Sequence, residues 1–174
     1  MAMNETIPVA AVVLAAGKSA RMGDFKQLLP IRGTPMLAVT IRKLLPFPFE
    51  RIVCVTGHRH EALQSAIQVD DRRFAWVHSP DYADGMSASL RTAAACCPSS
   101  AQAVMIFLAD QPFIQASTIS RFFDEFRQAC DATALQNGSF NLPATGKKAI
   151  PSCFPGRCLA ILRSWRATPG RKRL

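Results

Sequence analysis

The sequence contains no apolar run that is long enough to cross a membrane. Its longest apolar stretches, such as residues 9–16 and 103–109, fall well below the roughly 20 residues that a membrane helix needs. The first eight residues, MAMNETIP, contain no basic segment followed by a long apolar stretch. We therefore expect neither a signal peptide nor a membrane protein.

Cysteine pairs of the kind that bind metals are also missing. The six cysteines lie at positions 54, 96, 97, 130, 153 and 158, with no C-x-x-C spacing, and two of them are adjacent. A disulfide framework would be unusual in a chain of 174 residues that is 49% apolar, because such a chain can bury a sizeable core. The thiols are therefore expected to be reduced and mostly buried, and the protein to be cytoplasmic.

Acidic residues are absent from the end of the chain. Residues 147–174 contain eight Lys and Arg and no Asp or Glu, which accounts for +8 of the net charge of +9. The other 146 residues carry 13 basic and 12 acidic side chains. The basic character therefore belongs to the tail and forms no patch on the body with aromatic side chains interleaved for base stacking, so nucleic acid is not an expected partner.

The body of the chain alternates between strand-like and helix-like segments. Strands are expected over residues 9–16, 51–56, 74–78 and 103–109, with a fifth over 132–135. Helices are expected over 61–67 and 86–97, from Thr34 as N-cap with Pro35 as first helical residue, and from Ser117 or Thr118. This order predicts an α/β fold of three layers, in which helices cover both faces of a mostly parallel sheet.

Ligands of such folds bind at the carboxyl ends of the strands, which places the loops 16–26, 79–89 and 110–114 at the site. The first loop lies in the stretch AAVVLAAGKSARMGDFKQLLP, residues 10–30. A P-loop would need glycine at Val12, and the dinucleotide fingerprint would need glycine at Ser19 and Met22, so both motifs are excluded.

What remains is a loop that leaves a strand with two glycines, Gly17 and Gly23, and presents Lys18, Arg21 and Lys26. A flexible backbone can offer N–H groups to an anion, and the cations can neutralise phosphate charge. A surface loop with solvated cations is the alternative that the residue types alone leave open.

Three segments in order resemble one family. LAAGKSARMGDFKQLLP, GMSASL and LADQP, which begin at Leu14, Gly85 and Leu108, are similar to signature segments of the MobA-like nucleotidyltransferases, and within them to the molybdenum cofactor cytidylyltransferase group. The resemblance covers roughly residues 7–140. It implies a Rossmann-like nucleotidyltransferase fold, with residues 1–146 as the nucleotidyltransferase domain.

The resemblance also implies roles for individual residues. Arg21 and Lys26 would bind the triphosphate and Asp110 would hold Mg²⁺, and these three would form the catalytic set. Nucleotide-binding positions would be Leu14, Ala15, Ala16, Gly17, Gly23, Gly85 and Ser89. The sequence itself agrees at Asp110, because this carboxylate follows seven apolar residues at the expected catalytic edge and hard cations prefer oxygen ligands. An aspartate that caps the turn before Pro112 is the alternative.

The implied reaction is Mg²⁺-dependent nucleotidyl transfer from CTP to molybdopterin or the molybdenum cofactor, with release of pyrophosphate. In this family the LAAG form tends to accompany CTP and LAGG tends to accompany GTP. His58, His60 and His78 have no expected catalytic role. One alternative is another NTP transferase of the same fold, with GTP or with a sugar or alcohol acceptor. The other is a non-catalytic protein that binds nucleotide or cofactor and assists maturation of a molybdenum hydroxylase apoenzyme.

The tail departs from the resemblance. The family would continue with G-H-P-x-L-F and then G-D-x-G-A, and neither occurs in residues 147–174. Residues 149–156, AIPSCFPG, can be encoded so that one added base yields Gly-His-Pro-Ile-Leu-Phe-Pro-Arg, and the second motif can be recovered opposite residues 165–171. We therefore hypothesise a one-base deletion near Lys148, which makes residues 147–174 an atypical basic tail and not an independent domain.

Overall fold

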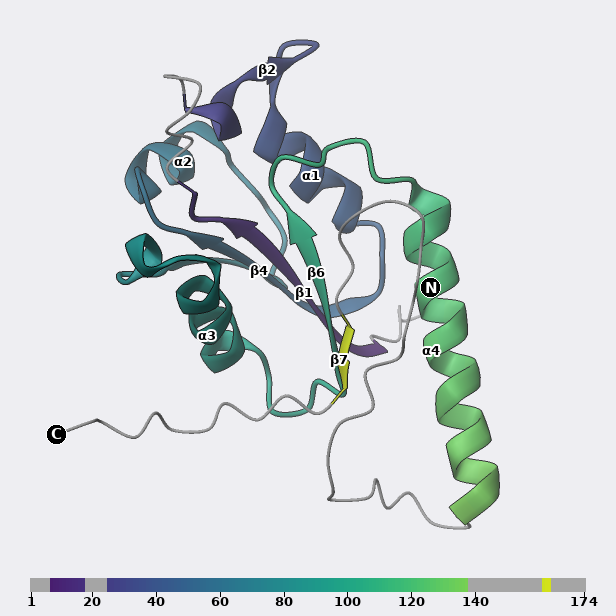
Figure 1. The fold of residues 1–174 in the computed structure, drawn as a ribbon. Helices are drawn as coiled ribbons and strands as arrows, with labels where there is room; N and C mark the ends of the chain where they lie inside the picture. The colour runs from purple at the N-terminus through teal and green to yellow at the C-terminus, as the bar shows by residue number, and fades with distance from the viewer. Residues whose placement is uncertain (1–6, 18–24, 138–160, 164–174) are drawn as a thin grey trace, which may run out of the picture.

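A computed structural model describes the chain over residues 7–17, 25–137 and 161–163 (Figure 1). Its centre is a five-stranded sheet with the strand order β5-β4-β1-β6-β7. The strands are β1 (Ile7–Ala15), β4 (Phe49–Thr56), β5 (Phe74–His78), β6 (Ala103–Leu108) and β7 (Ile161–Arg163). All neighbouring pairs are parallel except β6 and β7, which are antiparallel. The predicted mostly parallel sheet is therefore confirmed.

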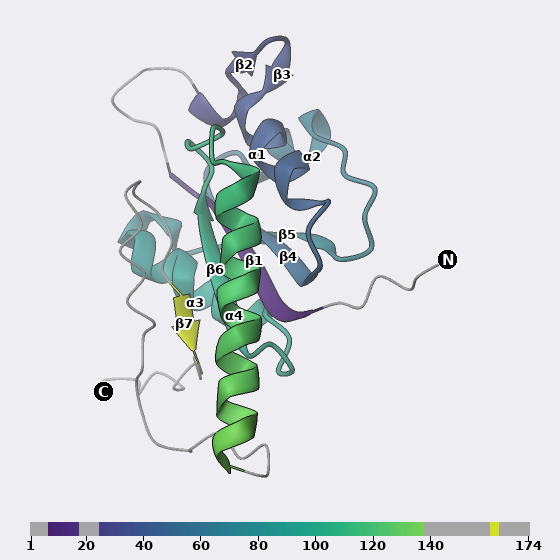
Figure 2. The same cartoon turned by 90° about the vertical axis from the view of Figure 1, so that its right-hand side faces the viewer.

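Helices cover both faces of this sheet. They are α1 (Met36–Leu44), α2 (His60–Ala66), α3 (Met86–Cys96) and α4 (Ala116–Asn137). Figures 1 and 2 show α1 and α4 on one side of the sheet and α3 on the other. No helix in the described part of the chain combines the length and the apolar character that a membrane span requires.

The central strand β1 explains the two cores, because successive side chains of a strand point to opposite faces. Val9, Ala11 and Val13 pack in one buried cluster with residues of α1, α2 and α4, whereas Ala10 and Val12 pack in a second cluster against α3. All five side chains have 0% exposure. A strand buried on both faces reads as a continuous apolar run, as this one does.

The strand expected over residues 132–135 is wrong, because these residues belong to α4. No glycine or proline interrupts the chain between the apolar stripe that begins at Ile119 and Gly138. Ala132, Ala134 and Leu135 are moreover strong helix formers. The helix therefore continues through this segment.

The helix start expected at Thr34 and Pro35 is also wrong. These residues form β3 (Thr34–Pro35), which pairs antiparallel with β2 (Pro30–Ile31), and α1 begins at Met36. The turn between the two strands consists of Arg32 and Gly33, with φ of 48° and 80°. Two positive φ values are characteristic of the tight hairpin turn that suits twisted strands. The turn signal at Gly33 thus outweighs the N-cap signal at Thr34.

Arg73 joins two loops at the amino-terminal side of the sheet. Its Nη2 donates to Asp71 Oδ2 over 2.6 Å, its Nε donates to Asp71 Oδ1 over 3.0 Å, and its Nη1 and Nη2 donate to the carbonyls of Phe47 and Leu45 over 2.7 and 2.6 Å. The two charged side chains are only 16% and 18% exposed. The hydrogen bond from Arg73 is the main cause that lowers the pKa of Asp71 below its ordinary value.

Asp71→Asn is expected to lower the free energy of unfolding by about 1.5–3 kcal/mol at neutral pH, since the bonds it weakens join two charged groups. A carboxylate with a lowered folded pKa contributes stability above its unfolded pKa, and this contribution disappears as the pH falls through the folded pKa. The difference in Tm between wild type and variant should therefore shrink below the ordinary pKa of 3.8. Asp70→Asn, an exposed neighbour, is the control. If the difference in Tm between wild type and Asp71→Asn is equal at pH 7 and at acid pH, the Asp71 carboxylate does not contribute in this way.

Candidate functional site

The carboxyl ends of β1, β4, β5 and β6 meet at one edge of the sheet, because these strands are parallel. Gly17 follows β1, Asp110 follows β6, and Gly85 precedes α3. The structure describes eight of the predicted site residues: Leu14, Ala15, Ala16, Gly17, Lys26, Gly85, Ser89 and Asp110. Arg21 and Gly23 lie outside the described residues, so their roles stay predictions.

Lys26 and Asp110 contact each other although 84 residues separate them. Lys26 Nζ lies 3.1 Å from Asp110 Oδ2, and the two side chains are 33% and 47% exposed. An ion pair this exposed contributes only about 0–1 kcal/mol, because water and salt screen it. A ligand that binds either group can therefore separate the pair at little cost.

A backbone hydrogen bond joins the ends of β1 and β6, and a hydroxyl group of α1 contacts the residue that follows β6. The Ala109 N–H donates to the Leu14 carbonyl over 3.1 Å. Thr40, which is fully buried in α1, donates weakly to the Ala109 carbonyl over 3.4 Å. Ala15 and Ala16 are buried, whereas Gly17 is exposed. The first loop, predicted over residues 16–26, therefore begins directly after a strand end that is hydrogen-bonded to the end of β6.

Gln27 also belongs to this site, and the sequence analysis missed it. Its side-chain nitrogen donates to the carbonyls of Ala15 and Gly17, over 3.2 and 3.1 Å, and the residue is only 6% exposed. The side chain thus ties the end of β1 to η1 (Lys26–Leu28), the short helix that carries Lys26. Glutamine carries no distinctive chemistry, and no signal in the sequence marks this contact.

Gly85 and Ser89 set the start of α3. Gly85 has φ of 103°, a conformation that residues with a Cβ rarely adopt, which explains the glycine at this N-cap position. Ser89 lies one turn into the helix and is 3% exposed. Gly85 ends the segment that follows β5 and Ser89 lies in α3, and the sequence predicted a nucleotide contact at both residues.

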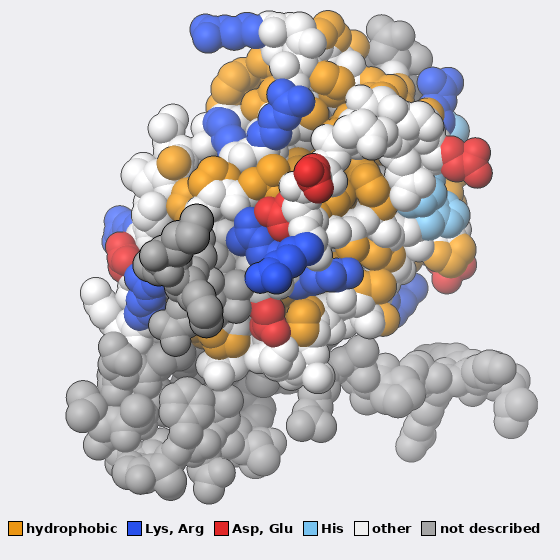
Figure 3. Space-filling view, turned by 180° about the vertical axis from the view of Figure 1, so that it is seen from behind, with side chains coloured by type: hydrophobic (Ala, Val, Ile, Leu, Met, Phe, Trp, Pro, Cys, Tyr) orange, Lys and Arg blue, Asp and Glu red, His pale blue; other side chains and the backbone are white. Residues whose placement is uncertain are grey.

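A cluster of histidines occupies the same edge at β4 and β5. His60 Nδ1 contacts Thr56 Oγ1, which also lies 3.2 Å from the Val77 carbonyl oxygen. The ring centroids of His60 and His78 are 5.1 Å apart, and Figure 3 shows histidine side chains grouped at one margin of the molecule. Burial is the main cause that lowers the pKa of His60, and the charge of His78 adds to it. The His60 imidazole is therefore neutral at pH 7.

Asp110 is a described carboxylate that could hold a metal ion at this edge. No group of three or more His, Cys, Asp and Glu with metal-binding geometry occurs among the described residues. One exposed carboxylate still fits Mg²⁺, which commonly binds one or two carboxylates together with substrate phosphates and water. The exposure of Asp110 leaves room for such additional ligands.

Comparison with known proteins identifies one family model, that of the MobA-like NTP transferase domain, which matches residues 11–174. Bifunctional protein GlmU of Desulfotalea psychrophila is 28% identical over 99% of this chain and 50% of its own length. Molybdenum cofactor cytidylyltransferase of Escherichia coli is 35% identical over 47% of this chain and 42% of its own length. The chain thus spans about half the length of these curated relatives.

Among solved structures, Rv0371c of Mycobacterium tuberculosis is similar to this chain with a TM-score of 0.60 and 34% identity, over 67% of this chain and 58% of that chain. A second structure of Rv0371c, a complex with manganese, has a TM-score of 0.56 at 30% identity, over 68% of this chain and 59% of that chain. The family match includes residues 147–174. Of residues 147–174 the structure describes β7 alone, and the hypothesis of a deletion near Lys148 stays a prediction.

Proposed function

Because the chain belongs to the MobA-like NTP transferase family, we propose that it transfers a cytidylyl group from CTP to the terminal phosphate of molybdopterin or the molybdenum cofactor. The contact between Lys26 and Asp110 at the carboxyl edge of the sheet is the observation that carries this proposal. It joins a phosphate-binding cation to a metal-binding anion beside the glycine loop. The cytidylyltransferase of Escherichia coli among the relatives supports the choice of CTP and of the acceptor.

In the proposed reaction, an oxygen of the acceptor phosphate attacks the α-phosphorus of CTP. The bond from that phosphorus to the oxygen shared with the β-phosphorus breaks, and pyrophosphate leaves. No covalent intermediate with the protein is needed, so the protein contributes alignment and charge stabilisation. Lys26 neutralises charge on the triphosphate, as Arg21 is predicted to do, and the backbone at Ala16 and Gly17 receives the nucleotide.

We propose Mg²⁺ as the metal, with Asp110 as one of its ligands. When bound, the metal would neutralise phosphate charge that the side chains leave uncompensated. The existence of a manganese complex of the similar protein Rv0371c supports the choice of a divalent cation. In this proposal Lys26 moves from Asp110 to the triphosphate when substrate binds, and their weak exposed pairing permits that exchange.

We also propose that the protein works in the cytoplasm. Cys54, Cys96 and Cys97 are free thiols. Burial raises the pKa of Cys54, and it raises the pKa of Cys97 to about 11. Both thiols are therefore protonated and unreactive at neutral pH, which suits a reducing compartment without requiring one.

A second candidate is transfer of another nucleotide to another acceptor, such as GTP or a sugar. The similarity to GlmU over nearly the whole chain favours it. Calorimetric titration of CTP, GTP, UTP and ATP in the presence of Mg²⁺ distinguishes the two candidates. Tightest binding of CTP is the result expected here. If another nucleotide binds most tightly, that nucleotide and not CTP is the substrate.

Gln27→Leu is expected to raise the KM for the nucleotide about tenfold, with a smaller effect on kcat. The variant removes two hydrogen bonds that position the glycine loop, and their loss corresponds to about 1–2 kcal/mol. Steady-state kinetics measure the change. Gln68→Leu is the control, since Gln68 donates to carbonyls on α2 and is exposed. If the KM for the nucleotide is unchanged in Gln27→Leu, Gln27 does not position the nucleotide site.

The tail hypothesis is tested by sequencing the coding DNA. A neighbouring reading frame near Lys148 is expected to encode G-H-P and then G-D-x-G-A. Restoring the missing base should raise both Tm and turnover, because among the described residues the tail adds only the short strand β7 to the sheet, and we do not expect its basic sequence to replace a packed strand and helix. If no neighbouring frame encodes these motifs, the tail is genuine and the hypothesis is wrong.

A further inference from the structure

Arg59 adopts a strained backbone conformation at the carboxyl edge of the sheet. It lies on the loop between β4 and α2, and its φ of 55° and ψ of 38° are in the left-handed region. Only two described residues other than glycine have positive φ, and the other one, Arg32, belongs to the hairpin turn between β2 and β3. Side chains with a Cβ avoid this region, and strained positions of this kind concentrate at functional sites.

The side chain of Arg59 is exposed but held in place. Its guanidinium carbon lies 5.5 Å from the centroid of the Phe25 ring, a cation–π contact. The edge of the same ring packs against His58, at a centroid distance of 6.1 Å. Phe25 directly precedes Lys26, so this ring connects Arg59 to the loop that carries the ammonium of the site.

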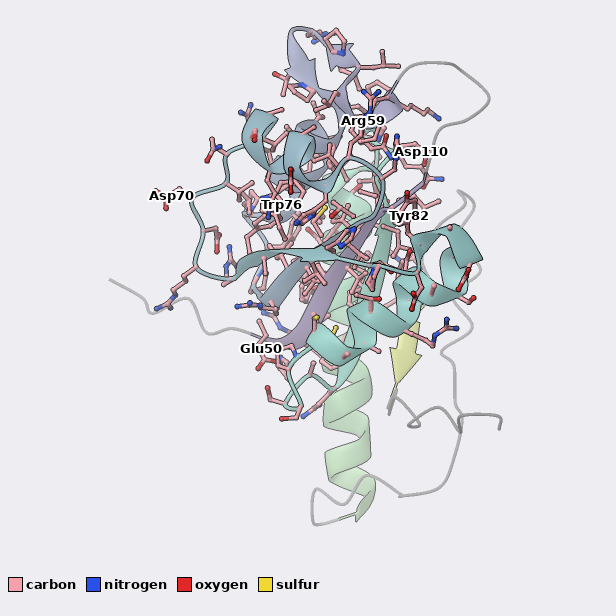
Figure 4. All side chains as sticks on the ribbon, turned by 90° about the vertical axis from the view of Figure 1, so that its left-hand side faces the viewer. Glu50, Arg59, Asp70, Trp76, Tyr82 and Asp110 are labelled. Carbon is pink, nitrogen blue, oxygen red and sulfur yellow. The ribbon has the colours of Figure 1, made fainter. Side chains whose placement is uncertain are left out.

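The loop before Arg59 packs closely against Tyr82. A Cβ on Gly57 would lie 2.3 Å from the Tyr82 ring, so the backbone directly after β4 contacts the segment that precedes α3. Figure 4 shows Arg59, Tyr82 and Asp110 toward the same end of the sheet. Arg59 is therefore presented from β4, on one side of β1, while Asp110 follows β6 on the other side.

Among the described residues, no carboxylate neutralises the charge of Arg59. Lys26 has Asp110 as its partner, whereas no carboxylate lies within ion-pair distance of Arg59 in the described ranges. An exposed guanidinium that stacks on Phe25, the residue before Lys26, and that has no described carboxylate partner is suited to an anion from outside the protein. Its planar fork of N–H donors matches two phosphate oxygens at once.

We propose that Arg59 binds a phosphate group of a substrate at this edge, as a second cation beside Lys26. The phosphate belongs either to the nucleotide triphosphate or to the acceptor. This inference rests on the proposed function, because it assumes substrates that carry phosphate. Phe25 positions the guanidinium, and the left-handed backbone of Arg59 directs it toward the loop that bears Lys26.

The test uses Arg59→Gln, which removes the charge, and Arg59→Lys, which keeps the charge and removes the fork. Arg72→Gln is the matched control, because Arg72 is exposed and precedes β5 at the opposite edge of the sheet. The KM for CTP and the KM for the acceptor are measured separately, together with Tm. Arg59→Gln is expected to raise one of the two KM values about tenfold or more, with partial recovery in Arg59→Lys.

A rise in the KM for CTP assigns the phosphate to the nucleotide, and a rise in the KM for the acceptor assigns it to the acceptor. Unchanged values for both substrates would overturn the inference. Should wild type turn over no nucleotide, the proposed function fails, and inorganic tripolyphosphate then serves as the probe. Weaker binding of tripolyphosphate by Arg59→Gln supports the phosphate site, and equal binding overturns it. If Arg59→Gln does not fold, Arg59→Gly, which relieves the backbone strain, replaces it in both measurements.

Discussion

Asp110→Asn is expected to fold as wild type does and to lose metal-dependent turnover by about 100-fold or more. Asparagine keeps the shape of the side chain but removes the negative charge that a hard divalent cation requires. The charge stabilisation that such a group supplies in a site closed by substrate is typically worth several kcal/mol. The measurement is the initial rate of pyrophosphate release as a function of Mg²⁺ concentration.

The fold should tolerate this change because Asp110 is 47% exposed and its pairing with Lys26 is weak. Asp124→Asn is the control, since Asp124 is an exposed carboxylate on α4. If Asp110→Asn keeps the Mg²⁺ dependence of wild type, then Asp110 is not a ligand of Mg²⁺. Its role is then to cap the turn before Pro112.

Lys26→Ala is expected to weaken nucleotide binding and to reduce turnover by about 100-fold, because it removes a charge-assisted contact to the triphosphate. Lys26→Arg should recover part of the loss, since it restores the charge with a different geometry. The same loss is predicted for Arg21→Ala, which concerns a residue outside the described ones. Calorimetry with CTP and Mg²⁺ measures the binding, and pyrophosphate release measures the turnover.

Arg42→Ala serves as the control for Lys26→Ala, because Arg42 is an exposed cation near the end of α1. Loss of Lys26 also frees Asp110 from its partner, so a double variant with Asp110→Asn shows whether the two residues act together. If Lys26→Ala turns over as fast as wild type, the glycine loop is not part of the active site.

The apolar pattern of the sequence predicted most of the sheet. β1, β4, β5 and β6 were expected within two residues of their observed ends, because strands buried on both faces are marked by continuous apolar runs. The errors arose where two short-range signals favour different structures. At Thr34 the turn formed by Arg32 and Gly33 produced a hairpin in place of the expected helix start. At Ala132 the helix α4 continued through the expected strand, because no helix breaker interrupts it.

The site was predicted only in part, for a physical reason. Lys26 and Asp110 could be named from their motifs, but their contact across 84 residues follows from the strand order β1-β6, which the sequence does not state. Gln27 and Arg59 escaped notice because their importance depends on which carbonyls and which ring they reach. Such contacts arise from tertiary packing and leave no pattern along the chain.

We propose that this chain transfers a nucleotidyl group by means of Lys26 and Asp110. The most direct measurement is pyrophosphate release by the purified chain with CTP, Mg²⁺ and molybdenum cofactor, compared with the same mixture without acceptor and without metal. The proposed function predicts release that requires all three components and that falls by about 100-fold in Asp110→Asn. Release that proceeds equally without Mg²⁺, or no release above the reaction without protein for any of the four nucleotides, would contradict it.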